Sequence, residues 1–156
     1  MKLVDILIKE AVKTDLQASD KKGVIEELSE LMVRAAGLSD SHIKGLTEVL
    51  LEREALCTTG IGFNIAIPHA KLKGVNGLIA AVARSKNGVN FDALDGKPVN
   101  LFFVLISGVN TEGTHLKALA KISSLLRNTE TREALISCDC KVEMYEIISR
   151  EESKSG

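Results

Sequence analysis

The sequence predicts a single α/β domain in which helices cover both faces of a β-sheet. Three observations indicate this class: helical periodicity in residues 20–53, short runs of Ile, Val and Phe in the middle of the chain, and renewed helical periodicity from residue 111. A chain of 156 residues can bury one core of ordinary size and is too short for two ordinary domains. Helices before and after a strand-rich middle are typical of a sheet between two helical layers.

Two helices are expected before the strands. In the first, apolar residues recur at helical spacing between Asp20, a residue type that caps helices, and Gly37, a residue type that ends them. The second begins at Ser39 or Asp40 and ends near Arg53. The short connection between the two helices predicts an antiparallel hairpin.

Three strands are expected at residues 65–69, 77–85 and 99–108. The last run is apolar on both faces, which is typical of a central strand covered on two sides. Turn residues such as Asn87–Gly88 and Asp95–Gly96 separate the second run from the third.

The remaining residues predict further helices at 111–128, 130–137 and 140–149. The charged and small residues of 151–156 predict a disordered, solvated tail.

Composition and charge exclude several function classes. Twenty basic and 21 acidic residues nearly cancel, and aromatic residues make up 3% of the chain, so neither a phosphate-backbone footprint nor a base-stacking platform for nucleic acid is expected. Charges interrupt the N-terminal region, and no apolar run is long enough to cross a membrane. The odd cysteine count favours free thiols. We therefore expect a cytoplasmic protein that does not bind nucleic acid or insert into a membrane.

The common motifs for nucleotides, metals and serine nucleophiles are missing from the sequence. There is no G-x-x-x-x-G-K-[ST], H-E-x-x-H or G-x-S-x-G pattern. Gly60 and Gly62 begin a G-x-G, but Ile65 stands where a dinucleotide fingerprint needs its third glycine. We expect no cofactor and no metal, and the candidate reactive groups are the three histidines.

The first two histidines differ in their surroundings. His42 lies among polar residues at the start of the second helix, where a solvated side chain is expected. His69 follows Pro68, which restricts the backbone on both sides of itself. Local pattern alone favours a working imidazole at His69 no more than a packed, hydrogen-bonded one.

His115 lies in the first turn of its helix if Thr111 or Thr114 is the cap. Free N–H groups and the positive end of the helix dipole favour an anion such as phosphate at this place. A half-buried histidine at the end of an apolar stripe is the alternative, and local pattern alone favours that alternative.

Three longer segments carry a family resemblance: LLEREALCTTGIGFNIAIPHAKLKG, AVARSKNGVNFDALDGKPVNLFFVLISG and THLKALAKISSLLRN. They resemble the enzyme IIA (EIIA) component of the bacterial phosphoenolpyruvate-dependent sugar phosphotransferase system (PTS), in its fructose/mannitol class, which also contains the nitrogen-regulatory IIA proteins. The resemblance covers roughly Leu3 to Ile148 and implies one type-2 EIIA domain over residues 1–150, with a mixed sheet sandwiched between helices in three layers.

The resemblance also implies a site and its chemistry. His69 would receive a phosphoryl group from phospho-HPr and pass it to a cysteine of a cognate EIIB domain. His115 would lie beside His69 and steady the ring or the phosphate, and Arg53 would direct positive charge at the phosphoryl oxygens. Phe63–Asn64 departs from the small residue or glycine of many relatives, which implies a changed loop shape or partner preference.

Phosphoryl transfer through a histidine needs alignment and positive charge, and it needs no metal or nucleotide. The hydroxyl of Thr58 or Thr59 is a further candidate donor to the phosphate. We also expect an exposed apolar patch around His69, formed by Ile61, Phe63 and Leu72, that docks HPr and EIIB transiently.

Two functions share this predicted site. In the first, the chain is a phosphocarrier that feeds a sugar permease. In the second, it is a regulatory module, and the phosphorylation state of His69 controls its binding to target proteins. A free-standing chain permits either.

Overall fold

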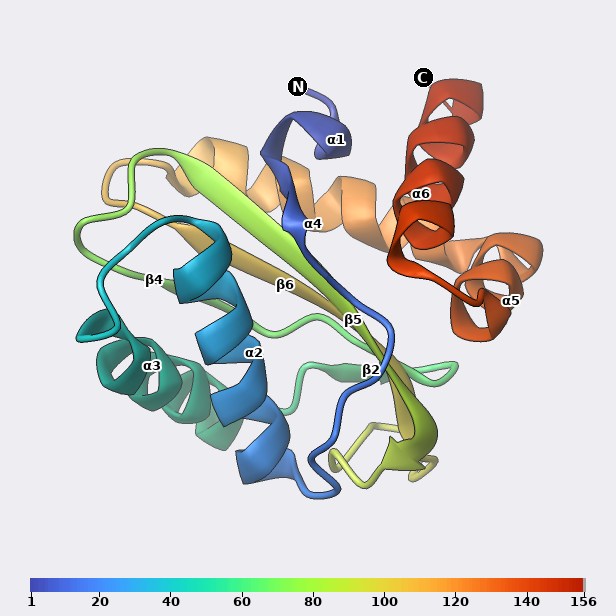
Figure 1. The fold of residues 1–156 in the computed structure, drawn as a ribbon, viewed down its shortest axis with the longest axis horizontal. Coiled ribbons are helices and arrows are strands. Elements are labelled where there is room, and N and C mark those ends of the chain that lie inside the picture. The colour runs from blue at the N-terminus through green and yellow to red at the C-terminus, as the bar shows by residue number, and fades with distance from the viewer. Residues whose placement is uncertain (156) are drawn as a thin grey trace.

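A six-stranded mixed sheet lies at the centre of the computed structural model, which describes residues 1–155 (Figure 1). In chain order its elements are α1 (Leu3–Ile6), β1 (Leu7–Lys13), α2 (Lys21–Ala35), α3 (His42–Leu56), β2 (Gly60–Gly62), β3 (Ile65–Ala66), β4 (His69–Lys71), β5 (Leu78–Val89), β6 (Val99–Ser107), α4 (Glu112–Arg127), α5 (Thr129–Ser137) and α6 (Lys141–Ser155).

The long antiparallel pair β5 and β6 forms the middle of the sheet. β1 pairs in parallel with the outer side of β5, and β3 and β4 pair in parallel with successive stretches of β6. Pro68 lies between β3 and β4, and because proline has no N–H it cannot donate to the ladder there. Its carbonyl still accepts from the Leu105 N–H at 3.0 Å, so the chain stays against β6 up to His69.

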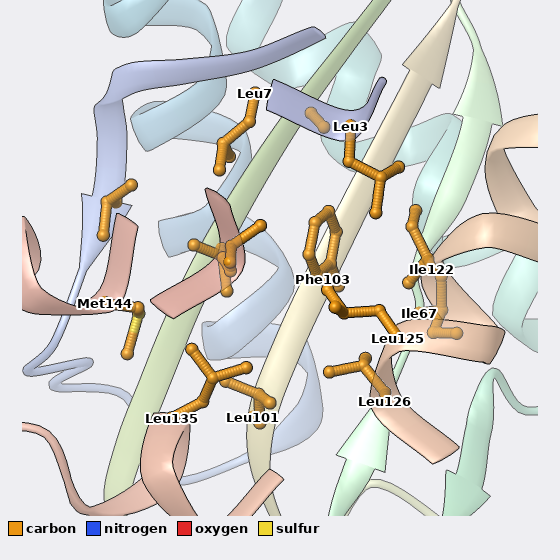
Figure 2. Close-up of a cluster of buried hydrophobic side chains, with 14 of the residues drawn as sticks. Leu3, Leu7, Ile67, Leu101, Phe103, Ile122, Leu125, Leu126, Leu135 and Met144 are labelled. Atoms are coloured by element: carbon orange, nitrogen blue, oxygen red, sulfur yellow. The ribbon is translucent and has the colours of Figure 1, made fainter. Parts of the chain in front are cut away.

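Side chains of β6 point alternately into two separate cores. Leu101, Phe103 and Leu105 pack against α1, α4, α5 and α6, and Figure 2 shows Phe103 near the middle of this cluster, with Leu3 and Ile122 among the side chains around it. Phe102, Val104 and Ile106 point to the opposite face, where α2 and α3 cover the sheet. The sequence-based prediction of a single domain with a mixed sheet between two helical layers is therefore confirmed (Figure 1).

The predicted helical hairpin is also present. The Asp20 carboxylate accepts from the Gly23 N–H at 2.9 Å and caps α2, as its residue type predicted. Gly37 follows the helix with a φ of 71°, a conformation that glycine adopts at low cost. α2 and α3 then pack against each other on one face of the sheet (Figure 1).

The two ends of the chain differ from the sequence analysis. The predicted disordered tail is wrong for residues 151–155, because α6 continues to Ser155, whereas Gly156 lies outside the described residues. The reason is a long-range contact: the Glu152 carboxylate accepts hydrogen bonds from the Leu3 and Val4 N–H groups at the start of α1. Sequence analysis assigned no element to α1 or β1, because charged residues interrupt their apolar pattern.

Candidate active site

A tight hairpin leads the chain into the site. Phe63 and Asn64 connect β2 to β3 with φ values of 57° and 65°, so both residues are in the left-handed region, as in the two-residue turns that suit β-hairpins. Phe63 and Asn64, which stand where many relatives have a small residue or glycine, thus form a short, defined turn. Gly60 precedes it at a close approach, because a Cβ there would lie 2.9 Å from the Cα of Ala93.

His69 is the first residue of β4 and is half-buried. Its Nδ1 lies 2.8 Å from the carbonyl oxygen of Ile67. A carbonyl can only accept, so Nδ1 carries the proton and the neutral ring keeps its lone pair on Nε2. Burial lowers the pKa of His69, and the positive charge of Arg53 lowers it further, while the Ile67 hydrogen bond and the Glu54 charge oppose this shift. The neutral, nucleophilic form is therefore favoured at pH 7.

The ring of His115 packs against the ring of His69. It lies in the first turn of α4 with 8% of its surface exposed, and the two ring centroids are 5.5 Å apart at an interplanar angle of 62°. Its Nδ1 is 2.8 Å from the hydroxyl of Ser107, the last residue of β6. Burial lowers the pKa of His115, as do the positive charges of His69 and Lys71. Two largely neutral imidazoles thus lie edge to face.

Arg53 lies in the last turn of α3. Its Nη1 donates to the Cys57 carbonyl at 2.7 Å, which directs the guanidinium along the end of the helix. A cation at a helix C-terminus is stabilised by the helix dipole. One donor is engaged in this way, and the planar fork has others for an anion.

These three side chains line one shallow, open cavity of about 490 Å³. The structure therefore brings together the three residues for which the resemblance implied a shared role. The complete lining is Val49, Glu52, Arg53, Leu56, His69, Ala70, Lys71 and His115.

The two candidate threonines do not line this cavity. The Thr58 hydroxyl donates to the Phe91 carbonyl at 3.0 Å. Thr59 is buried, and its hydroxyl donates to the Glu54 carboxylate. Because both hydroxyls have structural partners, neither is placed to donate to a phosphate at His69.

The expected docking patch is not assembled around His69. Ile65 pairs with Leu101 and His69 pairs with Leu105, so these two residues are about 13 Å apart along β6. The Phe63 turn precedes Ile65 and therefore lies at the end of this stretch that is far from His69. Phe63 is 64% exposed there, and the guanidinium of Arg132 lies 4.8 Å from its ring centroid. Ile61 belongs to the same hairpin and is 39% exposed. Leu72 follows β4 but packs against the core under α2 and α3.

Other apolar side chains surround the cavity instead, and sequence reasoning missed them. Leu56 is 83% exposed and lines the cavity one turn after Arg53, together with Val49 and Ala70. Lys71 could have been found from strand alternation, which places residues 69 and 71 on one face.

In the part of the chain that the structure describes, no group of three or more His, Cys, Asp or Glu side chains could hold a metal ion. Nor is any helix among residues 1–155 both long enough and apolar enough to pass through a bilayer.

Two named relatives can be aligned with nearly the whole length of this chain. It is 35% identical over 150 residues to the PTS system fructose-specific EIIABC component of Bacillus subtilis, covering 96% of this chain and 23% of that longer protein. It is 34% identical over 149 residues to a nitrogen regulatory protein of Bradyrhizobium diazoefficiens, covering 96% of this chain and 95% of the relative.

Solved structures share its fold. The nitrogen regulatory protein IIA-Ntr of Neisseria meningitidis superposes with a TM-score of 0.84 at 35% identity, covering 92% of this chain and 97% of that one. A complex of enzyme IIAMTL and phosphorylated enzyme IIBMTL from Escherichia coli contains the same fold, with a TM-score of 0.71 at 18% identity over 90% of this chain and 95% of that one.

The family described as "Phosphoenolpyruvate-dependent sugar phosphotransferase system, EIIA 2" matches residues 5–151. The chain therefore belongs to the type-2 EIIA family of the phosphoenolpyruvate-dependent sugar phosphotransferase system.

Proposed function

We propose that this chain is a phosphocarrier that accepts a phosphoryl group on Nε2 of His69 and passes it to a cysteine of an EIIB domain. One observation carries the proposal: Nδ1 of His69 donates to the Ile67 carbonyl, which leaves the lone pair of a half-buried ring on Nε2 beside a cavity shared with His115 and Arg53. Family membership supports a phosphotransferase role, and the histidine relay is our assignment.

The two transfers balance without a cofactor. In the first, Nε2 of His69 attacks the phosphorus of phospho-HPr, so that the N–P bond of the donor breaks as the new N–P bond forms. In the second, an EIIB cysteine thiolate attacks the same phosphorus, an S–P bond forms as the Nε2–P bond breaks, and the electron pair of that bond returns to Nε2 of the neutral His69 ring. A histidine suits both steps because it is a good nucleophile near pH 7 and a good leaving group once phosphorylated.

Arg53 and His115 supply the electrostatics of the transfer. Negative charge spreads over three phosphoryl oxygens in the transition state. The guanidinium fork matches two such oxygens, and a ring nitrogen of His115 can donate to the third. Each preorganised donor of this kind lowers the barrier by about 3 kcal/mol.

Donor and acceptor must use the same face in turn. We assign their docking to the apolar rim of the cavity, where Leu56 is largely exposed, in place of the hairpin residues Ile61 and Phe63. A small apolar rim favours weak, transient binding, as a relay requires. We place this exchange in the cytoplasm.

A regulatory role is the second candidate. A relative named nitrogen regulatory protein is 34% identical and matches over 96% of this chain and 95% of its own length. In this role the phosphorylation state of His69 would control binding to target proteins, with the same chemistry at the ring.

The test is direct labelling. The chain is incubated with phosphoenolpyruvate, enzyme I and HPr, and acid-labile phosphate is measured in the wild type and in His69→Ala. We expect labelling of the wild type alone; full labelling of His69→Ala would refute the site. Transfer onward to a fructose-type EIIB would then favour transport, and a labelled chain that no EIIB discharges would favour regulation.

A further inference from the structure

The carboxylate of Glu54 is buried next to the site and is not part of the cavity lining. Its side chain is 3% exposed, although the residue directly follows Arg53 in α3. One oxygen accepts from the Thr59 N–H at 3.0 Å, and the other accepts from the Thr59 hydroxyl. Lys21 at the start of α2 lies 3.1 Å from the first oxygen. A carboxylate with this many partners is held rigidly in one position, because moving it would leave several buried polar groups unpaired.

A continuous path of hydrogen bonds leads from this carboxylate to the reactive ring. Glu54 holds Thr59 at its N–H and hydroxyl, and the Thr59 carbonyl accepts from the Ile67 N–H at 3.0 Å. The Ile67 carbonyl accepts from Nδ1 of His69 at 2.8 Å. Pro68 restricts the ψ of Ile67 to extended values, so holding the N–H of Ile67 also determines where its carbonyl points.

We infer that Glu54 is a positioning residue, which fixes the Nδ1–H tautomer and the direction of the His69 ring through Thr59 and Ile67. A free neutral imidazole in water favours the opposite tautomer, with its proton on Nε2. That proton would block the nitrogen to which we assign the phosphoryl group, and the hydrogen bond at the other nitrogen decides where it goes. The effect on phosphoryl transfer rests on the proposed function, whereas the effect on the ring does not.

A second contact set ties Glu54 to the rest of the scaffold. Lys21 also lies 3.6 Å from Asp92 and 4.7 Å from the ring centroid of Phe91. The Thr58 hydroxyl donates to the Phe91 carbonyl. Helix α2, the loop after β5 and the loop after α3 thus meet around Lys21 and its ion-pair partner Glu54, which makes residue 59 a rigid base for the strand that carries His69.

The test uses three substitutions and one control. Glu54→Leu removes all hydrogen bonds of the carboxylate, Glu54→Asp keeps the charge opposite Lys21 but shortens the reach to Thr59, and Glu54→Gln keeps the reach without the charge. Arg84→Met is the matched control, because Arg84 is also a buried charged residue (3% exposed) but donates to carbonyls of Thr14, Ile136 and Cys138.

Two readouts are measured on each folded variant. The first is the His69 tautomer, from the imidazole ¹⁵N shifts at pH 8. The second is the rate of phosphoryl transfer from phospho-HPr. We expect Glu54→Leu to raise the Nε2–H population and slow transfer about 100-fold. We expect Glu54→Asp to change both in the same direction, with a rate loss of about tenfold. Glu54→Gln should restore the wild-type tautomer, and Arg84→Met should keep it.

Glu54→Asp decides the matter if Glu54→Leu does not fold. A wild-type tautomer and rate in Glu54→Asp overturns the inference, and so does an equal tautomer change in Arg84→Met. If the wild type itself takes no phosphoryl group from phospho-HPr, the proposed function fails, and the tautomer measurement still tests the role of Glu54 by itself.

Discussion

Two polar regions, a buried one around Arg84 and a half-buried one around His69, use their hydrogen bonds in different ways. Arg84 in β5 donates from Nε to the Thr14 carbonyl at 3.1 Å and from Nη1 to the Ile136 carbonyl at 3.0 Å, which joins the segment after β1 and the end of α5 to β5. His69 is only half-buried, and one of its ring nitrogens is engaged by Ile67. Arg84 donates to backbone carbonyls that hold the fold together, whereas the His69 ring uses Nδ1 for a backbone carbonyl and lines an open cavity. The contacts of Arg84 therefore indicate a structural role, and the arrangement of His69 indicates a reactive one.

The largest effect in this comparison is expected at Arg53. Arg53→Ala should slow phosphoryl transfer about 100-fold, because it removes a preorganised donor worth about 3 kcal/mol of barrier. Arg53→Lys should recover only part of the rate, since an ammonium lacks the planar fork. Arg34→Ala removes an exposed arginine from the last turn of α2 and is the control. Single-turnover kinetics with phospho-HPr measure the three rates, and equal rates in Arg53→Ala and Arg34→Ala would contradict this role.

The Arg84 region should respond in stability and not in transfer. Arg84→Met leaves buried carbonyls without their donor, so the free energy of unfolding should fall by about 3 kcal/mol. Urea denaturation at pH 7.5 measures this loss. The transfer rate of the folded variant should match the wild type, and a large loss of rate in well-folded protein would break the comparison.

A smaller effect is expected at the apolar rim. Leu56→Ala should raise the apparent KM for phospho-HPr about fivefold, which corresponds to about 1 kcal/mol of docking energy, and should leave kcat unchanged. Phe63→Ala is the matched control, because Phe63 is similarly exposed but belongs to the distant hairpin. A larger KM effect from Phe63→Ala would restore the hairpin as the docking surface.

The smallest effect is a pH dependence of stability. The pKa values of His69 and His115 are both lowered in the folded chain, chiefly by burial, from an ordinary value of 6.5. Below pH 6.5 the unfolded chain therefore binds more protons than the folded one, so stability falls as the pH drops through the folded-state values and is unaffected by these groups above 6.5. Urea denaturation at pH 7.5 and pH 5.0 should show a smaller loss for His115→Gln than for the wild type.

The sequence predicted the layers of the fold because periodicity reports which faces are buried. The doubly apolar run at residues 99–108 indicated the central strand that β6 forms, and Asp20 marked the start of α2 correctly. It missed β1, whose charges hide its pattern, and the end of α6, which depends on a contact between Glu152 and the start of α1. Contacts between distant residues leave no periodic trace.

The candidate site divides in the same way. Family resemblance nominated His69, His115 and Arg53, and the fold brings them to one cavity. The threonines and the hairpin residues were chosen by nearness in sequence, which does not fix direction: Thr59 points to Glu54, and Phe63 lies under Arg132. Glu54 could not be recognised from sequence, because its role depends on hydrogen bonds that only the folded chain makes.

The most direct measurement is the identity of the phosphorylated nitrogen. The chain is ¹⁵N-labelled, phosphorylated through enzyme I and HPr, and its histidine side chains are recorded by ³¹P and ¹⁵N NMR. We predict one phosphohistidine, at His69, with phosphorus coupled to Nε2 and Nδ1 still protonated. A phosphoryl group on Nδ1 of His69, or on His115 in its place, would contradict the account.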